Sequence, residues 1–152
     1  MKNLKRKIMI ASASIYLAAS AFFVSGIALA DGKSKAEVSE LASSFIEAVD
    51  ENNDAALKEL LHADMIQYVR LNGNLIPFHA KDFIQMIADK KLGGVPREFT
   101  VSSAKIVRDQ TAYADVNAVS DEYDFMYHIS MAHSGQRWVI VGIIADIKSA
   151  SK

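Results

Sequence analysis

The second half of the chain limits its possible folds more than any other feature. Four segments of strand-like composition follow one another there, separated by short polar turns: residues 98–107, 111–119, 123–133 and 137–147. Strands of this length exceed the usual five to six residues and suit a strongly curved antiparallel sheet. We therefore expect a sheet that wraps around helices supplied by the first half of the chain.

Helical patterns precede these strands. From Val38 to Val49, apolar side chains recur at helical spacing and the acidic ones lie mostly on the other side. A polar segment ends this helix, and Asp54 is the expected N-cap of a short second helix. A third helix is expected after His79, which takes its cap position. The buried side of that third helix is predicted to consist of Phe83, Met86 and Ile87.

A β-hairpin is predicted between the second and third helices. Residues 65–71 have strand composition, and Asn72-Gly73 follows them. This dipeptide is the strongest short hairpin signal, because both residues tolerate positive φ. Residues 75–78 then form the return strand, and residues 93–96 break the chain before the long strands.

The first 30 residues have the three parts of a secretory signal peptide. Residues 1–7 are basic, residues 8–30 contain no charge, and the small residues Ala28 and Ala30 stand at positions −3 and −1. The 23 uncharged residues could instead span a bilayer as an uncleaved anchor, but serines and Gly26 dilute the run. We expect cleavage after Ala30 and a periplasmic or secreted protein. Because the chain has no Cys, a lipoprotein is excluded.

The predicted mature chain has a flexible leader at 31–35, one domain at 36–148 and a tail at 149–152. All 18 acidic residues remain after cleavage whereas four of the 17 basic ones are lost, so its formal charge is −5. That charge disfavours nucleic acid or an anionic membrane as a partner. With no Cys, packing alone must hold the fold.

Three short sequences carry a family resemblance: Leu61-His62-Ala63-Asp64 before the first strand, Asn72-Gly73 in the hairpin, and residues 135–141 (GQRWVIV) leading into the last strand. In their order and spacing they resemble the nuclear transport factor 2-like superfamily, in the branch named for lumazine binding, across about residues 36–148. The resemblance implies an α+β cone, with three N-terminal helices packed on a strongly curved antiparallel sheet around a cavity. It also implies pairing as a homodimer through the open face of the sheet.

The cone leads to an expected ligand site without a cofactor or metal. The expected occupant of the cone is a small apolar or cyclic ligand, since such pockets are apolar with a few polar anchors, or else a partner chain. Its predicted wall residues are Tyr68, Phe78, Met86, Tyr127 and Trp138. For the dimer, strict alternation assigns Val139, Val141 and Ile143 to the face opposite Trp138, Ile140 and Ile144. Apolar residues on both faces would need a cover on each, and on the face away from the helices that cover is either a partner chain or the C-terminal segment or the neighbouring strand.

An enzymatic alternative stays open. Isomerases and dehydratases of this superfamily need a base and a donor inside the cone, and His128 or Asp115 as base with Tyr127 as donor are the available candidates. Each also has a structural interpretation: Tyr127 as a core aromatic, His128 on a dimer surface and Asp115 exposed to solvent. His62 and Asp64 are too few for a metal site. The residues therefore favour a non-catalytic binding domain.

Overall fold

The computed structural model describes residues 19–150, and side chains from Ser34 onward. The predicted signal peptide therefore lies largely outside the described residues. The helices are α1 (Ala19–Asp50), α2 (Asp54–Leu60) and α3 (Ala80–Ala88). The strands are β1 (Leu61–Leu71), β2 (Asn74–His79), β3 (Glu98–Arg108), β4 (Thr111–Val119), β5 (Tyr123–His133) and β6 (Trp138–Ser149).

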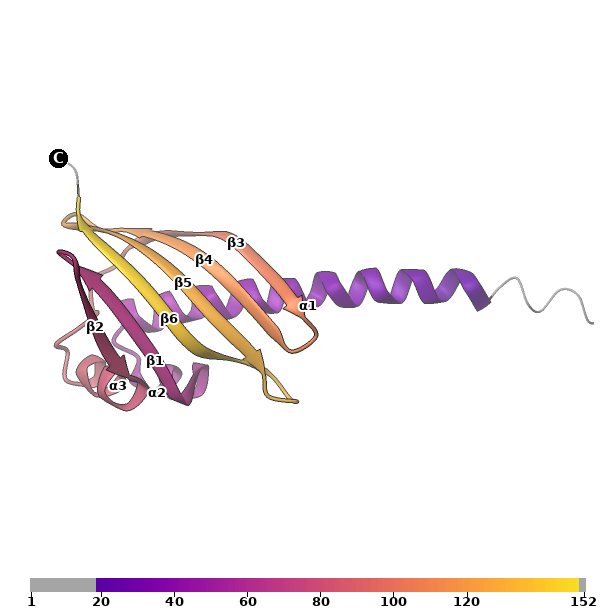
Figure 1. Cartoon of the computed structure of the whole chain (residues 1–152), viewed down its shortest axis with the longest axis horizontal. Helices are drawn as coiled ribbons and strands as arrows, with labels where there is room; N and C mark the ends of the chain where they lie inside the picture. The colour runs from indigo at the N-terminus through magenta and orange to yellow at the C-terminus, as the bar shows by residue number, and fades with distance from the viewer. Residues whose placement is uncertain (1–18, 151–152) are drawn as a thin grey trace, which may run out of the picture. The chain divides into compact units, whose positions relative to one another are not determined.

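Six strands form a single curved sheet in the order β2-β1-β6-β5-β4-β3 (Figure 1). All neighbouring strands are antiparallel except β1 and β6, which run parallel. The last strand thus lies in the interior of the sheet, between the N-terminal hairpin and the meander. This arrangement of helices on a mostly antiparallel curved sheet confirms the predicted α+β cone.

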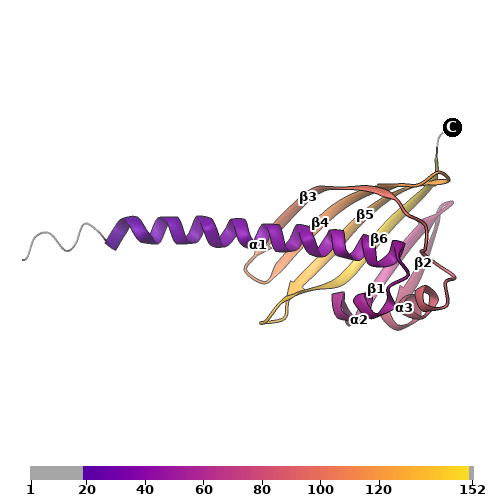
Figure 2. The ribbon, with the colours of Figure 1, turned by 180° about the vertical axis from the view of Figure 1, so that it is seen from behind.

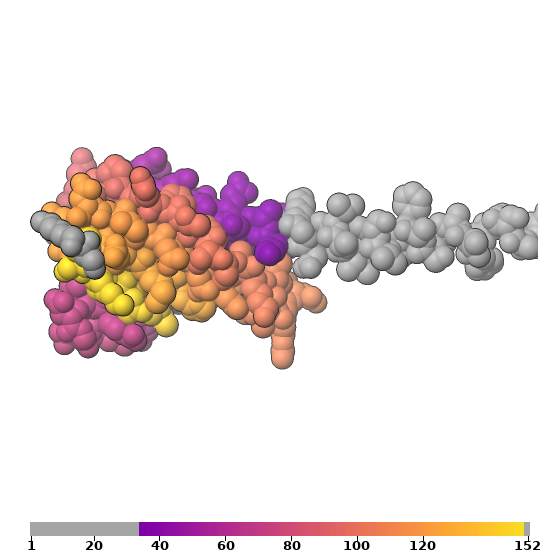
Figure 3. Space-filling model, turned by 90° about the horizontal axis from the view of Figure 1, so that it is seen from above, coloured from indigo at the N-terminus to yellow at the C-terminus, as the bar shows by residue number. Residues whose placement is uncertain are grey.

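The part of α1 that belongs to the folded unit, from Lys35 onward, crosses one face of the sheet (Figure 2). We call this the inner face and the opposite one the outer face. The space-filling view shows the same part of α1 beside the segments of β3 and β4 (Figure 3). Apolar side chains from α1, from α2 and from alternate positions of the central strands form the core between the helices and the sheet. Its largest fully buried members include Phe45, Ile46, Leu57, Met65, Ile129, Met131, Ile140 and Ile143.

The helix ends differ in detail from the prediction. Asn53, not Asp54, caps α2, because its side chain accepts a hydrogen bond from the backbone N–H of Ala56 at 3.0 Å. Asp54 instead begins the helix and pairs with Lys58 one turn later, at 2.7 Å. His79 occupies the N-cap position of α3 as expected, but its side chain makes no capping hydrogen bond.

Residues 31–35, expected as a flexible leader, fall within the span of α1. The predicted cleavage position after Ala30 falls within the span of this helix. Between residues 19 and 150, no helix is long and apolar enough to cross a membrane.

A β-bulge in β6 changes the predicted faces of the last strand. Ile140 pairs with Met131 but Gly142 pairs with Ser130, so Val141 is an extra residue between them. Beyond the bulge the faces are reversed relative to strict alternation. Ile143 is therefore a core residue at 2% exposure, whereas Ile144 lies on the outer face at 43%. The assignment of Ile143 to the outer face was wrong for this reason.

The chain that follows α3 passes very close to the end of α1. Gly94 donates a backbone hydrogen bond to the carbonyl of Val49 at 3.1 Å. Gly93, with φ +73°, lies against the same carbonyl, and a Cβ atom at Gly93 would stand only 2.1 Å from that oxygen. Only glycine fits this crossing without displacing backbone.

We expect Gly93→Ala to lower the free energy of unfolding by at least about 2 kcal/mol more than Gly73→Ala does, because overpacking adds to backbone strain. Gly73 is the matched control: its φ is +80°, and a Cβ atom there would have no neighbour within 4 Å. Urea denaturation of both variants measures the difference. Equal losses would contradict the close approach at Gly93.

Candidate ligand cavity

A cavity of about 540 Å³ opens between the inner face of the sheet and the helices. Its walls come from the end of α1, from β1 and β2, from α3, and from β5 and β6. The segments 92–97 and 120–122 complete it. Its apolar and aromatic lining consists of Phe45, Val49, Val69, Leu71, Ile76, Phe78, Phe83, Leu92, Val95, Tyr123, Phe125, Tyr127 and Ile147. This volume lies within the range of about 300–1,000 Å³ typical of small-molecule sites.

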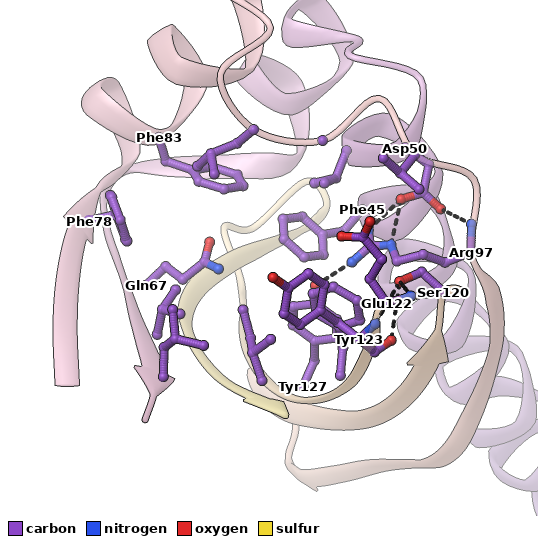
Figure 4. A pocket seen from close by; sticks show the side chains of 18 of the residues that line it. Phe45, Asp50, Gln67, Phe78, Phe83, Arg97, Ser120, Glu122, Tyr123 and Tyr127 are labelled. Atoms are coloured by element: carbon purple, nitrogen blue, oxygen red, sulfur yellow. Dashed lines mark hydrogen bonds and ion pairs between the residues drawn. The ribbon is translucent and has the colours of Figure 1, made fainter. Parts of the chain in front are cut away.

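Aromatic rings form the deep wall (Figure 4). Phe45 of α1 packs edge-on against Tyr127 with centroids 6.1 Å apart, and Phe83 of α3 lies 6.2 Å from Phe45. Phe125 and Tyr127 alternate along the same face of β5 and have parallel rings, 6.0 Å apart. Rigid rings of this kind offer flat surfaces on which a planar ligand can stack.

A buried ion pair lies on one side of the cavity. Arg97 Nε donates to Asp50 Oδ1 at 2.6 Å, and the backbone N–H of Arg97 donates to Asp50 Oδ2 at 3.1 Å. The side chain of Arg97 is only 5% exposed and that of Asp50 only 12%. The pair joins the C-terminus of α1 to the segment that leads into β3.

The same guanidinium contacts β5. Its Nη1 donates to the hydroxyl of Tyr127, and its central carbon lies 4.8 Å from the centre of the Phe125 ring. Burial alone would lower the pKa of Arg97, but the attraction of Tyr127 and Asp50 outweighs it, and that pKa is raised. Burial raises the pKa of Tyr127, although Arg97 acts against this rise. The site therefore holds a charged guanidinium and a neutral phenol.

One polar side chain of the wall has no partner for its oxygen. Gln67 of β1 is 5% exposed, and its Oε1 is fully buried without a hydrogen bond from any described residue. Figure 4 shows its amide end directed toward the cavity, below Phe83. Arg97 Nη2 is also without a well-aligned hydrogen bond among the described residues, although it lies 2.5 Å from Asp50 Oδ1. Buried polar groups normally find partners, but both of these atoms are closed to solvent and therefore also to the cavity.

The mouth of the cavity carries two carboxylates. Asp121 and Glu122 are exposed residues of the turn between β4 and β5 and contribute to the lining. Ser120 fixes this turn, since its hydroxyl accepts hydrogen bonds from the backbone N–H groups of Glu122 and Tyr123, at 3.4 and 3.1 Å. Together with the Asp50–Arg97 pair, the lining has three carboxylates and one guanidinium, which gives it an excess of negative charge.

The structure places two of the five predicted wall residues in the cavity, Phe78 and Tyr127. Tyr68 instead projects from the outer face of β1 at 39% exposure, opposite its neighbours Gln67 and Val69. Trp138 is buried at 8% and packs edge-on against His133, so it belongs to the core outside the cavity lining. Met86 is half-buried on α3 and does not line the cavity either.

The two predicted bases are not brought to Tyr127. His128 and Asp115 face each other on the outer side of β5 and β4, with His128 Nδ1 2.7 Å from Asp115 Oδ1. Partial burial alone would raise the pKa of Asp115, but hydrogen bonds from His128 and Ser103 outweigh it and lower that pKa. Neither residue lines the cavity. Among the side chains that the structure describes, from Ser34 to Ala150, no group of three or more His, Asp or Glu residues could hold a metal ion.

Sequence reasoning missed Arg97, Asp50 and Gln67 as site residues. Gln67 has a usable signal: it stands between Met65 and Val69 at the alternating positions of β1 that face the core. A polar residue in such a row is worth testing as a ligand contact. Asp50 and Arg97 have no comparable signal, because they are 47 residues apart and both lie at the ends of predicted elements.

Comparison with known proteins places the chain in a family. Residues 33–143 match the family described as "Putative lumazine-binding", and the chain belongs to it. This confirms the superfamily and the branch that the three short sequences indicated. No curated protein is similar enough to count as a match.

Solved structures share the fold. A nuclear transport factor 2-like protein of unknown function from Silicibacter pomeroyi has a TM-score of 0.66 and 18% identity, over 74% of this chain and 94% of that one. A second, from Shewanella baltica, has a TM-score of 0.65 and 13% identity, over 75% and 93%. A ketosteroid isomerase-like protein from Erwinia carotovora atroseptica has a TM-score of 0.63 and 8% identity, over 78% and 97%. At these identities the similarity establishes the fold alone.

Asp50→Asn should destabilise the protein by about 3 kcal/mol, because it leaves the guanidinium of Arg97 buried without its counter-charge. Glu59→Gln is the matched control. Glu59 also pairs with an arginine, at 3.0 Å from Arg137 Nη1, but the two side chains are 72% and 56% exposed. That loss should stay below about 1 kcal/mol. Chemical denaturation measures the free energy of unfolding of both variants. Similar losses would show that the buried ion pair stabilises the protein no more than the exposed one does.

Proposed function

We propose that this protein is an exported, non-catalytic binding protein that holds a small, mostly apolar molecule in the cavity of its cone. The cavity is the observation that carries the proposal. Its volume of about 540 Å³, its mostly apolar lining and its few buried polar groups are the features of a small-molecule site. The family takes its name from lumazine, and a flat ring of that kind suits aromatic walls.

The arrangement of ionisable groups supports binding over catalysis. Acid–base chemistry on a bound substrate needs a base within hydrogen-bond reach of it. His128 and Asp115 lie on the outer face, and Asp50 is engaged by two N–H groups of Arg97. Asp121 and Glu122 are exposed at the mouth. A base poised beside Tyr127 is therefore lacking among the described residues, which favours the non-catalytic proposal over an isomerase or dehydratase.

Export is supported by the N-terminal pattern of a basic start, an uncharged run and small residues before Asp31. Native mass spectrometry of protein from the periplasm of its host tests location and binding together. The expected chain begins at Asp31 and carries a small molecule that is lost on unfolding. Repeated absence of any bound molecule would count against the binding proposal, and a chain retaining Met1 would count against cleavage.

Val69→Trp should weaken binding of the uncharged fluorescent probe N-phenyl-1-naphthylamine, because the indole would occupy part of the cavity that Val69 lines. Tyr68→Trp is the matched control, since the adjacent side chain points to the outer face. We expect at least a tenfold loss of probe affinity for the first variant and none for the second, by fluorescence titration. Equal binding by both variants would place the probe elsewhere.

We further propose that the protein forms a homodimer through the outer face. Tyr68, Met126, Val141 and Ile144 are exposed there at 37–54%, and we call them the outer patch. Tyr68 and Ile144 are register partners on neighbouring strands. An ion pair lies beside them, in which Arg70 Nη1 and Asp146 Oδ1 are 3.3 Å apart. A patch with charges of both signs can meet a copy of itself across a two-fold axis.

Ile144→Glu should convert the dimer to a monomer, because a carboxylate at the centre of the outer patch would be buried against its symmetry copy. Val107→Glu is the control: Val107 is 55% exposed, but it lies on β3 at the edge of the sheet. Light scattering at tens of micromolar measures both. A monomer mass for the unmodified protein would refute the homodimer.

A further inference from the structure

We infer that the cavity holds an apolar molecule with one positively charged end, whose apolar body lies inside while an ammonium group lies at the mouth. This inference rests on the proposed binding function and adds the charge and the orientation of the ligand. Three features of the lining carry it: an inner wall without net charge, two carboxylates at the mouth, and an exposed aromatic ring beside them.

The inner wall suits the apolar end of the ligand. The cavity has a volume of about 540 Å³, and aromatic rings form its deep wall, so it indicates a ligand independently of the acidic residues. Arg97 is the only basic residue of the lining that the structure describes, and Asp50 balances its charge at 2.6 Å. The guanidinium also covers the ring of Phe125, at 4.8 Å from the ring centre. Burying a further, unpaired ion at this end would be costly.

The mouth, in contrast, carries a net negative charge. Asp121 and Glu122 line it from the turn between β4 and β5, and neither forms an ion pair with another described residue. The turn is held closed, because the backbone N–H of Ser120 donates to the carbonyl of Tyr123 at 2.9 Å. Both carboxylates are therefore kept near the opening, where they attract a cation and repel an anion.

Tyr123 adds an aromatic surface to this acidic turn. It lines the cavity at 39% exposure, and its ring packs edge-on against Phe125 with centroids 6.2 Å apart. Figure 4 shows Glu122 and Tyr123 on the same side of the cavity, opposite Phe78. The face of an aromatic ring attracts cations, and rings near carboxylates are a usual means of binding ammonium groups. The ring can also contact the apolar body, so Tyr123 lies where the two parts of the ligand join.

Three probes that share one ring system test the inference: naphthalen-2-ylmethylamine, naphthalen-2-ylmethanol and naphthalene-2-carboxylate. Each competes with N-phenyl-1-naphthylamine at pH 7.5 and low salt, where the amine is an ammonium ion. A single charge pair at 4 Å is worth about a factor of five even in water. The ammonium probe should therefore bind at least fivefold more tightly than the alcohol, and the carboxylate most weakly.

The outcomes separate this inference from the binding function. Equal affinities of the three probes, or a preference for the alcohol or the carboxylate, would overturn the inference while leaving the binding function intact. Failure of N-phenyl-1-naphthylamine itself to bind would instead refute the binding function. Because salt screens exposed charges, 1 M NaCl should lower the ratio of ammonium to alcohol affinity at least twofold. A ratio that salt does not change would also contradict the inference.

A double variant assigns the preference to the mouth. Asp121→Asn/Glu122→Gln should lower the ratio of ammonium to alcohol affinity at least threefold and leave the affinity for the alcohol unchanged. Its control, Asp64→Asn/Asp109→Asn, removes the same charge from exposed residues outside the lining and should keep the ratio. An unaltered ratio in the mouth variant, or an equal fall in the control, would overturn the inference.

A second pair of variants tests the aromatic ring. Tyr123→Leu should lower the ratio of ammonium to alcohol affinity about threefold, because it removes the ring face that attracts the cation. Tyr123→Phe keeps that face and should keep the ratio. Equal ratios in both variants would refute the contribution of the ring to ammonium binding.

Discussion

The buried guanidinium of Arg97 is the interaction on which the ligand-binding end of the molecule depends. Moving a cation out of water is costly unless it finds a counter-charge and hydrogen bonds in place of its hydration shell. Arg97 finds them on two elements, in the carboxylate of Asp50 at the end of α1 and in the hydroxyl of Tyr127 on β5. The carboxylate and the hydroxyl must therefore stay close together, and the wall between them is held in place.

The cavity follows from this arrangement and from the close crossing at Gly93. The segment from Leu92 to Arg97 closes over the end of α1, tied by a backbone bond to Val49 at one point and by the ion pair at the other. Phe45 cannot turn to fill the cavity without leaving its contacts with Phe83 and Tyr127. A well-packed cone would bury more apolar surface, so the open volume is the expected cost of a binding site.

The sequence predicted the order of elements closely, because each depends on a local pattern. Helical spacing from Val38 onward, the Asn72-Gly73 turn and the long alternating strands are all properties of neighbouring residues. The site was predicted less well because it depends on distant ones. Tyr127, one of the predicted wall residues, does line the cavity, but the bulge at Val141 moved Ile143 into the core. The apolar residues on both sides of that bulge gave no sign of where the alternation would shift.

The parallel pairing of β1 with β6 has a consequence for how the chain folds. Since β6 lies between β1 and β5, it alone joins the N-terminal hairpin to the meander. Until the final strand is present, both of these flanking strands expose unpaired edges, which are the usual starting points of aggregation. Pairing between the two ends of a domain is also slow, because a long loop must close first. The sheet therefore stays in two pieces until the C-terminal segment arrives, and a chain crossing a membrane from its N-terminus would remain in that unfinished state throughout the passage.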